Sequence, residues 1–250
     1  MAQRNDWTRD QLLIALQLYL ETDFGRLHGK NPEIIELANK IGRTPSALAM
    51  KACNFASIDP KLSQKGLSGA SQADRALWQE LQMNSSKLSD EMEAASKRLH
   101  IPLRKPDPRL KIPTGVTEKE SLVRVRRVQS FFRTALLVSY ESRCAISGIA
   151  ITDLLVASHI IPWRISEEHR ANPSNGILLN ALFDRAFDSG FMTFDEDLRV
   201  VLSKRLKEKL IAPVLHCSFL DVEGQKLRLP KRLPPMAESL DYHRQNVFQE

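Results

Sequence analysis

Three short stretches between residues 157 and 188 decide the fold. They read Ala157-Ser-His-Ile-Ile-Pro-Trp163, then Asn175-Gly-Ile-Leu-Leu179, then Leu182-Phe-Asp-Arg-Ala-Phe-Asp188. A strand ends at His159, a polar loop follows, Asn-Gly makes a turn into a second strand, and a helix closes the segment. The sequence therefore predicts a β-loop-β-helix unit, and Trp163 is expected to pack the loop.

The residues before this unit predict a helix and two further strands. A long amphipathic helix is expected from Glu118 to Tyr140, with an apolar face formed by Leu122, Val125, Val128, Phe132, Leu136 and Leu137. Residues 144–148 and 154–157 are expected to be short strands around a turn. Near the other end of the chain, His243 is interpreted as a histidine that packs against this unit.

The first 60 residues predict a compact helical module. Thr8 and Gln11 form a capping-box pattern, Asn31-Pro32 is a strong helix start, and Gly42 is a helix stop. A new helix is expected at Thr44-Pro45, only two residues later. A helix, a short turn and a capped helix are the helix-turn-helix layout, in which the second helix enters a DNA groove. Its candidate DNA contacts are Arg43, Thr44, Ser46, Lys51 and Asn54. A structural or protein-docking role is the alternative.

A second helical stretch and a connector follow this module. Residues 70–99 predict two helices broken at Asn84-Ser85-Ser86, with Trp78 in the core. Four prolines between residues 102 and 113 exclude a helix and indicate a semi-extended connector. The predicted class is α+β, an all-helical, helix-turn-helix-like module followed by the β-loop-β-helix domain. The boundaries are 1–60 for the module, 61–113 for the second stretch and connector, and 114–250 for the domain.

Composition restricts the location and the partners. The 250-residue chain is 42% hydrophobic, and it has no apolar run of membrane-spanning length or signal-peptide type, so we expect a cytoplasmic protein. The odd, widely spaced cysteines Cys53, Cys144 and Cys217 are interpreted as buried free thiols. A net charge of +6 favours a polyanionic partner. Basic residues predominate between Lys97 and Arg133, which suits a phosphate-facing surface, although a solvated face plus a linker would show the same pattern.

The segment from Arg143 to Gly190 resembles the HNH (His-Me finger, ββα-metal) endonuclease family. The resemblance extends over roughly residues 120–250 and is greatest to the subgroup found in bacterial restriction and defence nucleases. It implies a nuclease fold in which His159 is the general base that takes a proton from water. It also implies that Asn175 orients the histidine by bonding across the loop, although Asn-Gly could be a plain turn.

The resemblance further implies a divalent metal ion that neutralises charge on the phosphate. Two positions depart from the family pattern. Ser158 stands where a metal ligand commonly precedes the base, and the final histidine of the family would fall near Phe183 or Asp184, where this chain has no histidine. Asp184 and Asp188 lie one helical turn apart and are our candidate ligands, with Ser158 as a third. Carboxylates favour Mg²⁺ or Mn²⁺, with Zn²⁺ or Ni²⁺ as alternatives. A local cap or salt bridge is the alternative role for Asp188.

The expected substrate is DNA. Arg185 is a candidate for stabilising the leaving group, and the candidate phosphate contacts outside the helical module are Arg124, Arg127 and Arg164. Restriction or anti-phage defence is the setting that the resemblance implies, and a homodimer would supply two sites for two strands. The alternatives are a DNA-binding protein that has kept the fold and lost its metal, and an RNA-directed nuclease.

Overall fold

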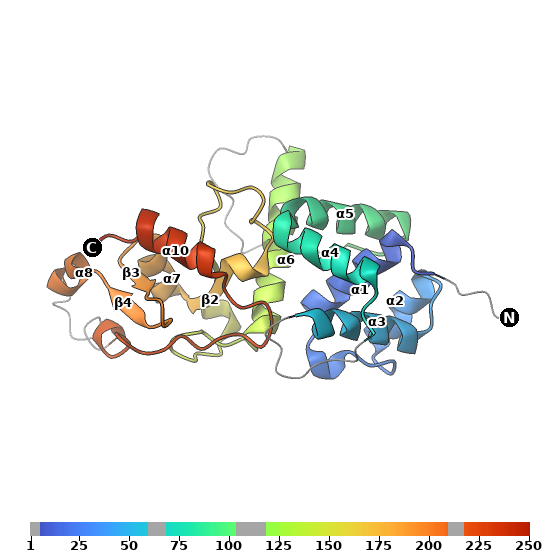
Figure 1. Ribbon diagram of the computed structural model, residues 1–250, viewed down its shortest axis with the longest axis horizontal. Helices are drawn as coiled ribbons and strands as arrows, with labels where there is room; N and C mark the ends of the chain where they lie inside the picture. Colours follow the sequence, from blue (N-terminus) through green and yellow to red (C-terminus); the bar gives the residue numbers. More distant parts are fainter. Residues whose placement is uncertain (1–5, 60–68, 104–118, 210–217) are drawn as a thin grey trace.

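The computed structural model describes residues 6–59, 69–103, 119–209 and 218–250. Helices make up the N-terminal part, and two small antiparallel sheets lie in the C-terminal part, which confirms the predicted α+β class (Figure 1). Residues 104–113 of the predicted connector and Cys217 lie outside the described residues. Within the described ranges, no helix has both the length and the apolar character needed to span a membrane.

The N-terminal helices begin at the predicted caps. Thr8 and Gln11 form a reciprocal capping box, and the side chains of Asn31 and Thr44 each accept a hydrogen bond from a backbone N–H of the helix that follows. Gly42 has a φ of +68°, which a glycine adopts without steric cost where the second helix ends. The helices are α1 (Arg9–Glu21), α2 (Pro32–Lys40), α3 (Pro45–Ile58), α4 (Gln72–Met83) and α5 (Ser85–Arg98), with a 3-10 turn at Phe24–Arg26.

Helix α3 is a core helix, although it has the position in the sequence that a recognition helix has in a helix-turn-helix. It packs against α1, α2 and α4. Lys51 is only 9% exposed, and its Nζ lies 3.1 Å from the fully buried carboxylate of Asp74 on α4. Asn54 is also buried and donates to the carbonyl of Gly69. The prediction that Lys51 and Asn54 face DNA is therefore wrong, because both side chains are buried and bond to groups inside the helical half.

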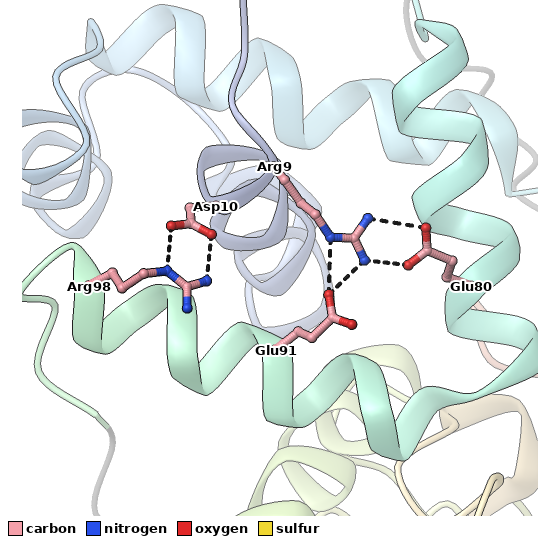
Figure 2. Close-up of polar contacts among 5 residues, drawn as sticks. All are labelled: Arg9, Asp10, Glu80, Glu91 and Arg98. Atoms are coloured by element: carbon pink, nitrogen blue, oxygen red, sulfur yellow. Dashed lines mark hydrogen bonds and ion pairs between the residues drawn. The ribbon is translucent and has the colours of Figure 1, made fainter.

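Arginine–carboxylate pairs orient α1 on its neighbours (Figure 2). The guanidinium of Arg9 bridges Glu80 of α4 and Glu91 of α5, and Arg98 of α5 holds Asp10 through two hydrogen bonds of 2.8 and 2.7 Å. The Arg98 guanidinium lowers the pKa of the Asp10 carboxyl. Arg9 is half exposed, so each of its two pairs contributes at most about 1 kcal/mol. The pairs fix orientation, while the buried leucines of α1 provide the larger stabilisation.

Helix α6 (Lys119–Ser139) lies between the two halves of the molecule (Figure 1). It contacts α1 and α5 on one side and the first sheet on the other. Val128 and Phe131 belong to the helical core, whereas Phe132, Leu136 and Tyr140 (just beyond the helix end) belong to a second core around the sheets. The predicted long helix is confirmed, and it contributes side chains to both cores.

The C-terminal half contains the predicted β-loop-β-helix unit. Strands β1 (Leu155–His159) and β2 (Gly176–Asn180) pair antiparallel, and α7 (Ala181–Asp188) packs on both. Asn180 caps α7 by accepting from the N–H groups of Leu182 and Phe183. The half is completed by two 3-10 turns, a second antiparallel pair and two helices: Thr152–Leu154, Pro173–Asn175, β3 (Met192–Phe194), β4 (Val200–Leu202), α8 (Lys204–Lys209) and α10 (Ala237–Asn246).

Residues 144–148 form a turn, not the predicted strand. The N–H of Gly148 donates to the carbonyl of Cys144, and Gly148 has a φ of +71°. The buried sulfur of Cys144 accepts from the N–H groups of Ser147 and Asn180, which ties the turn to the start of α7. Cys144 and Cys53 are free thiols, but only Cys144 is fully buried.

Candidate active site

His159 is the last residue of β1 and pairs with Gly176, the first residue of β2. A Cβ atom at position 176 would lie 2.5 Å from Cζ of Phe132 and 2.6 Å from Cδ1 of Leu136, closer than atoms can approach. The absent side chain therefore allows α6 to lie directly against the end of the sheet. Gly176 is a packing requirement of the site as well as part of a turn.

The imidazole of His159 is held between two aromatic rings. It stacks on Phe132 with a centroid distance of 3.8 Å and an interplanar angle of 10°, and it meets Trp163 edge-on at 5.5 Å. Trp163 is partly buried against the helical core, and the guanidinium of Arg170 lies over its ring. The prediction that Trp163 packs the loop is confirmed. These contacts fix the plane of the imidazole.

A hydrogen bond determines which nitrogen of His159 is available as a base. Nε2 lies 3.0 Å from the backbone carbonyl oxygen of Arg170. A carbonyl oxygen only accepts, so Nε2 carries the proton and the lone pair is on Nδ1. Nδ1 makes no hydrogen bond within the described residues and is not fully enclosed, although protein covers most of the ring. The ring is oriented to accept a proton at Nδ1.

Burial keeps this imidazole neutral. Desolvation lowers the pKa of His159 to about 4, and the hydrogen bond to the Arg170 carbonyl opposes the shift only in part. Close to pH 7 nearly every molecule therefore carries the unprotonated form. A general base has to be unprotonated, so the lowered pKa and the free lone pair on Nδ1 both suit His159 to that role.

Asn175 fixes the loop that leaves His159. Its buried side chain accepts from the N–H of Ile161 at 2.9 Å and donates to the carbonyls of Ile161 at 3.2 Å and His169 at 3.5 Å. Its own carbonyl accepts from the N–H of Ile160 at 3.0 Å. Asn175 thus holds both sides of the β1–β2 loop and makes no hydrogen bond to the imidazole within the described residues. Its contacts to the histidine segment all run through the backbone.

Asp184 and Asp188 lie on α7 close enough for their charges to interact. The pKa of Asp188 is raised to about 6, first by desolvation and then by the negative charge of Asp184, while Arg185 opposes the shift. Ser158 is 2% exposed, and its Oγ has no hydrogen-bond partner among the described residues. The two carboxylates meet the requirement of a cation for hard oxygen ligands, whereas the Ser158 hydroxyl is enclosed within the protein.

The described residues do not contain a complete set of protein ligands for a metal. Nowhere in these ranges do three or more His, Cys, Asp or Glu side chains form a group that could hold an ion. Magnesium commonly binds through one or two carboxylates, with water and substrate phosphate completing its shell. Asp184 and Asp188 fit that mode. Phe183 cannot be a ligand, because a phenyl ring has no donor atom, and its side chain is buried against Phe219.

The candidate phosphate contacts differ in how far their charges are already compensated. Arg124 pairs with Asp90 and Arg127 with Glu93, so helix α5 neutralises these two residues of α6. Arg164 and Arg185 are exposed and form no ion pair with described residues. Of these four arginines, Arg164 and Arg185 present the less compensated charge.

The candidates at the start of α3 lie near the surface. Arg43 donates to Gln11 and to the carbonyl of Asp6, and its guanidinium lies over the ring of Trp7. Thr44 is the N-cap of α3, and Thr44 and Ser46 are exposed. Of the contacts predicted in this module, these three remain accessible to a partner.

Sequence reasoning missed two parts of the site. Phe132 was expected only as a core residue, and Arg170 was not identified. The aromatic character of Phe132 at helical spacing looks the same whether it packs on a leucine or on a histidine. Arg170 contributes a backbone carbonyl, for which a sequence carries no signal.

Comparison with known proteins supports the nuclease interpretation of this region. Residues 144–195 match a family model described as HNH endonuclease, and this segment contains His159, Arg170, Asn175, Asp184 and Asp188. The match supports the resemblance to HNH endonucleases. It covers residues 144–195, a shorter range than the 120–250 expected from the sequence. A search of curated proteins found no match to the chain.

Proposed function

We propose that the protein is a metal-dependent endonuclease that hydrolyses phosphodiester bonds of DNA, with His159 as the general base. The observation that carries this proposal is the geometry of the histidine: Nε2 faces the Arg170 carbonyl, and Nδ1 has no hydrogen-bond partner among the described residues. Burial, which lowers the pKa of the ring, favours its neutral form. The match of residues 144–195 to the HNH endonuclease model supports the reaction class.

In the proposed reaction, Nδ1 of His159 takes a proton from a water molecule as the water oxygen attacks the phosphorus. The P–O bond to the leaving oxygen then breaks, and that oxygen takes a proton from solvent. The aromatic contacts of the ring hold the base in one orientation, which lowers the entropic part of the barrier. Asn175 acts as a positioning residue, because it fixes the loop on both sides.

Asp184 and Asp188 are the proposed ligands of the divalent cation, which when bound would stabilise negative charge on the phosphate and the leaving oxygen. The pKa of Asp188, raised first by desolvation and then by the negative charge of Asp184, supports this assignment, because a bound cation would favour the ionised carboxylate. The structure gives no equivalent support for Ser158, whose hydroxyl is enclosed. Mg²⁺ and Mn²⁺ are the proposed ions.

Arg185 and Arg164 are the proposed contacts to the phosphates nearest the cleaved bond, because both are exposed and form no ion pair with described residues. Arg43, Thr44 and Ser46 are proposed as weaker contacts at the start of α3. Arg124 and Arg127 would first have to leave their carboxylate partners, so we assign them a smaller part in binding.

The second candidate is a DNA-binding protein without catalytic activity. One observation favours it: within the described ranges, no three ligand-type side chains form a metal group. The unpaired Nδ1 of His159 favours the enzyme, since a purely structural histidine would normally have both nitrogens satisfied. Tight DNA binding without cleavage under every metal tested would select this candidate.

The deciding experiment is plasmid cleavage by the full chain, with Mg²⁺ or Mn²⁺ and with EDTA. We expect metal-dependent nicking that is lost in His159→Ala and reduced in Asp184→Asn. The matched control is His28→Ala, which replaces an exposed histidine of the helical half and should cleave like the wild type. Equal cleavage by His159→Ala and His28→Ala would overturn the assignment of the base.

We also propose restriction or anti-phage defence as the setting, on the resemblance alone. Plaque counts on cells that express the wild-type protein or His159→Ala test it. Protection that depends on His159 would support a defence role, and equal plaque counts over a broad set of phages would contradict it.

A further inference from the structure

The β1–β2 loop, which carries the carbonyl that bonds His159, is anchored on the junction between α4 and α5. Both the N–H and the hydroxyl of Ser85 donate to the carbonyl of Glu168, at 3.1 and 2.8 Å. The hydroxyl of Ser86 donates to the carbonyl of Glu167 at 2.5 Å. Two adjacent serines of the helical half thus hold two adjacent carbonyls of the candidate active-site loop.

The position of these serines explains why the contact forms there. Ser85 and Ser86 are the first two residues of α5, where backbone N–H groups have no partner within the helix. Loop carbonyls placed at this end satisfy such a donor and lie at the positive end of the helix dipole. Both serines are buried, with 1% and 6% exposure, so water does not replace these bonds.

Three peptide groups connect the serines to the imidazole. The Glu167 carbonyl that Ser86 holds also faces the N–H of Arg170 at 3.4 Å. The carbonyl of the same Arg170 accepts from Nε2 of His159 at 3.0 Å. A displacement of residues 167 and 168 would therefore move the carbonyl that selects the tautomer of the base.

The same loop is also held in the helical core by apolar contacts. Ala171, the residue after Arg170, is fully buried in the core formed by α1–α5, and Trp163 packs against that core. The loop has its own internal bond from Nε of Arg170 to the carbonyl of Trp163. The loop therefore packs on the helical half through apolar contacts, and the two serines provide the polar contacts of the same interface.

We propose that Ser85 and Ser86 are positioning residues for His159, and that the helical half is thereby a structural part of the active site. The proposal rests on the proposed function, because it concerns how the base of that reaction is held. The serines fix the Glu167 and Glu168 carbonyls, these fix the Arg170 carbonyl, and the Arg170 carbonyl keeps the proton of His159 on Nε2.

The test compares the Ser85→Ala/Ser86→Ala double variant with Ser89→Ala in the full chain. Ser89 lies one turn further along α5, is partly exposed and makes no hydrogen bond to the described residues of the loop, so it is a matched control for removing a hydroxyl. We expect kcat for plasmid nicking to fall about 10- to 100-fold in the double variant, with KM unchanged. Ser89→Ala should match the wild type, and Ser86→Thr, which keeps a hydroxyl, should retain most of the activity.

A second measurement separates positioning from a loss of folding and from a failure of the proposed function. Nitrogen-15 NMR of the His159 ring reports the tautomer without any cleavage. We expect a pure Nε2–H tautomer in the wild type and in Ser89→Ala, and a mixture of tautomers in the double variant. If the double variant fails to fold, the two single alanine variants should show the same change to a smaller extent. Wild-type kcat together with an unchanged tautomer would overturn the proposal, whereas a wild type that cleaves nothing would overturn the proposed function alone.

Discussion

Two histidines in the C-terminal half have nearly the same surroundings. His159 stacks on Phe132 with centroids 3.8 Å apart, and His243 of α10 stacks on Phe187 at 3.7 Å. Nε2 of each ring donates to a backbone carbonyl, that of Arg170 for His159 and that of Phe187 for His243. Burial is the largest cause in both cases and lowers each pKa to about 4.

The two histidines differ at Nδ1. Nδ1 of His243 accepts from the hydroxyl of Thr193 at 3.0 Å, and the side chain is 1% exposed, so every polar atom is satisfied inside the core. Nδ1 of His159 has no hydrogen bond within the described residues. A lowered pKa alone therefore does not distinguish a base from a packing residue here. The unpaired acceptor does, and the following experiments test that distinction.

The largest expected effect is on cleavage. His159→Ala should lower kcat/KM by about 10²–10⁴-fold, the contribution typical of a general base. His243→Ala should leave kcat/KM per folded molecule close to that of the wild type, because the ring is closed off from substrate. Steady-state nicking rates, corrected for the folded fraction by circular dichroism, provide the comparison. A loss of similar size in both variants would mean that Nδ1 does not separate the two roles.

The second effect, on stability, should run in the opposite order. His243→Ala removes a stacked ring and two hydrogen bonds and leaves the Thr193 hydroxyl without its acceptor. We expect a loss of about 2–4 kcal/mol in the free energy of unfolding. His159→Ala also removes a stacked ring, but only one hydrogen bond, and this ring is partly exposed, so its loss should be smaller. Urea unfolding at pH 7.5 measures both.

The helix starts and the β-loop-β-helix unit could be predicted, because each depends on residues close together in the chain. Thr8 with Gln11, and Asn31 with the N–H of Glu33, are pairs within three positions. The unpaired state of His159 could not be predicted, because it depends on Arg170 and on Phe132, which lies 27 positions before it in the numbering. A general base was inferred from resemblance, whereas its tautomer came from the structure.

The charged candidates also depend on residues that are distant in the sequence. Lys51 has the position of a DNA contact on a second helix, but its charge is compensated by Asp74, a residue of another helix. Arg124 and Arg127 give the sequence a basic stretch, while their carboxylate partners lie on α5. A basic stretch of sequence predicts a basic surface only where the fold does not place carboxylates beside the basic side chains.

The third effect is a dependence of stability on pH to which both histidines contribute. An unfolded histidine has a pKa of about 6.5, whereas each folded one has a pKa of about 4. Between these values the unfolded chain binds protons that the folded protein does not, so stability falls as pH decreases from about 6.5 to 4. The slope should become smaller in His243→Ala. Urea midpoints at pH 7.5, 6.0 and 5.0 measure it, and an identical slope in wild type and variant would contradict the shift at His243.

The smallest expected effect concerns the carboxylates, whose dependence on pH has the opposite sign. The pKa of Asp188 is raised to about 6 from an unfolded value of about 3.8, so its contribution to stability is lost as pH rises through that interval. In EDTA at pH 7.5, Asp188→Asn should therefore be slightly more stable than the wild type. The gain should be at most about 1 kcal/mol, because Asp188 is exposed and solvent screens the repulsion from Asp184.

Adding Mg²⁺ or Mn²⁺ should reverse this order, because an ion that binds only the folded protein stabilises it. We expect the metal to raise the melting temperature of the wild type and to change that of Asp188→Asn less. Differential scanning fluorimetry over a range of metal concentrations gives both values, and Asp153→Asn, an exposed carboxylate before β1, is the control substitution. Equal metal-induced shifts in all three proteins would place the ion away from α7, and His159 would then have no metal partner at Asp184 and Asp188.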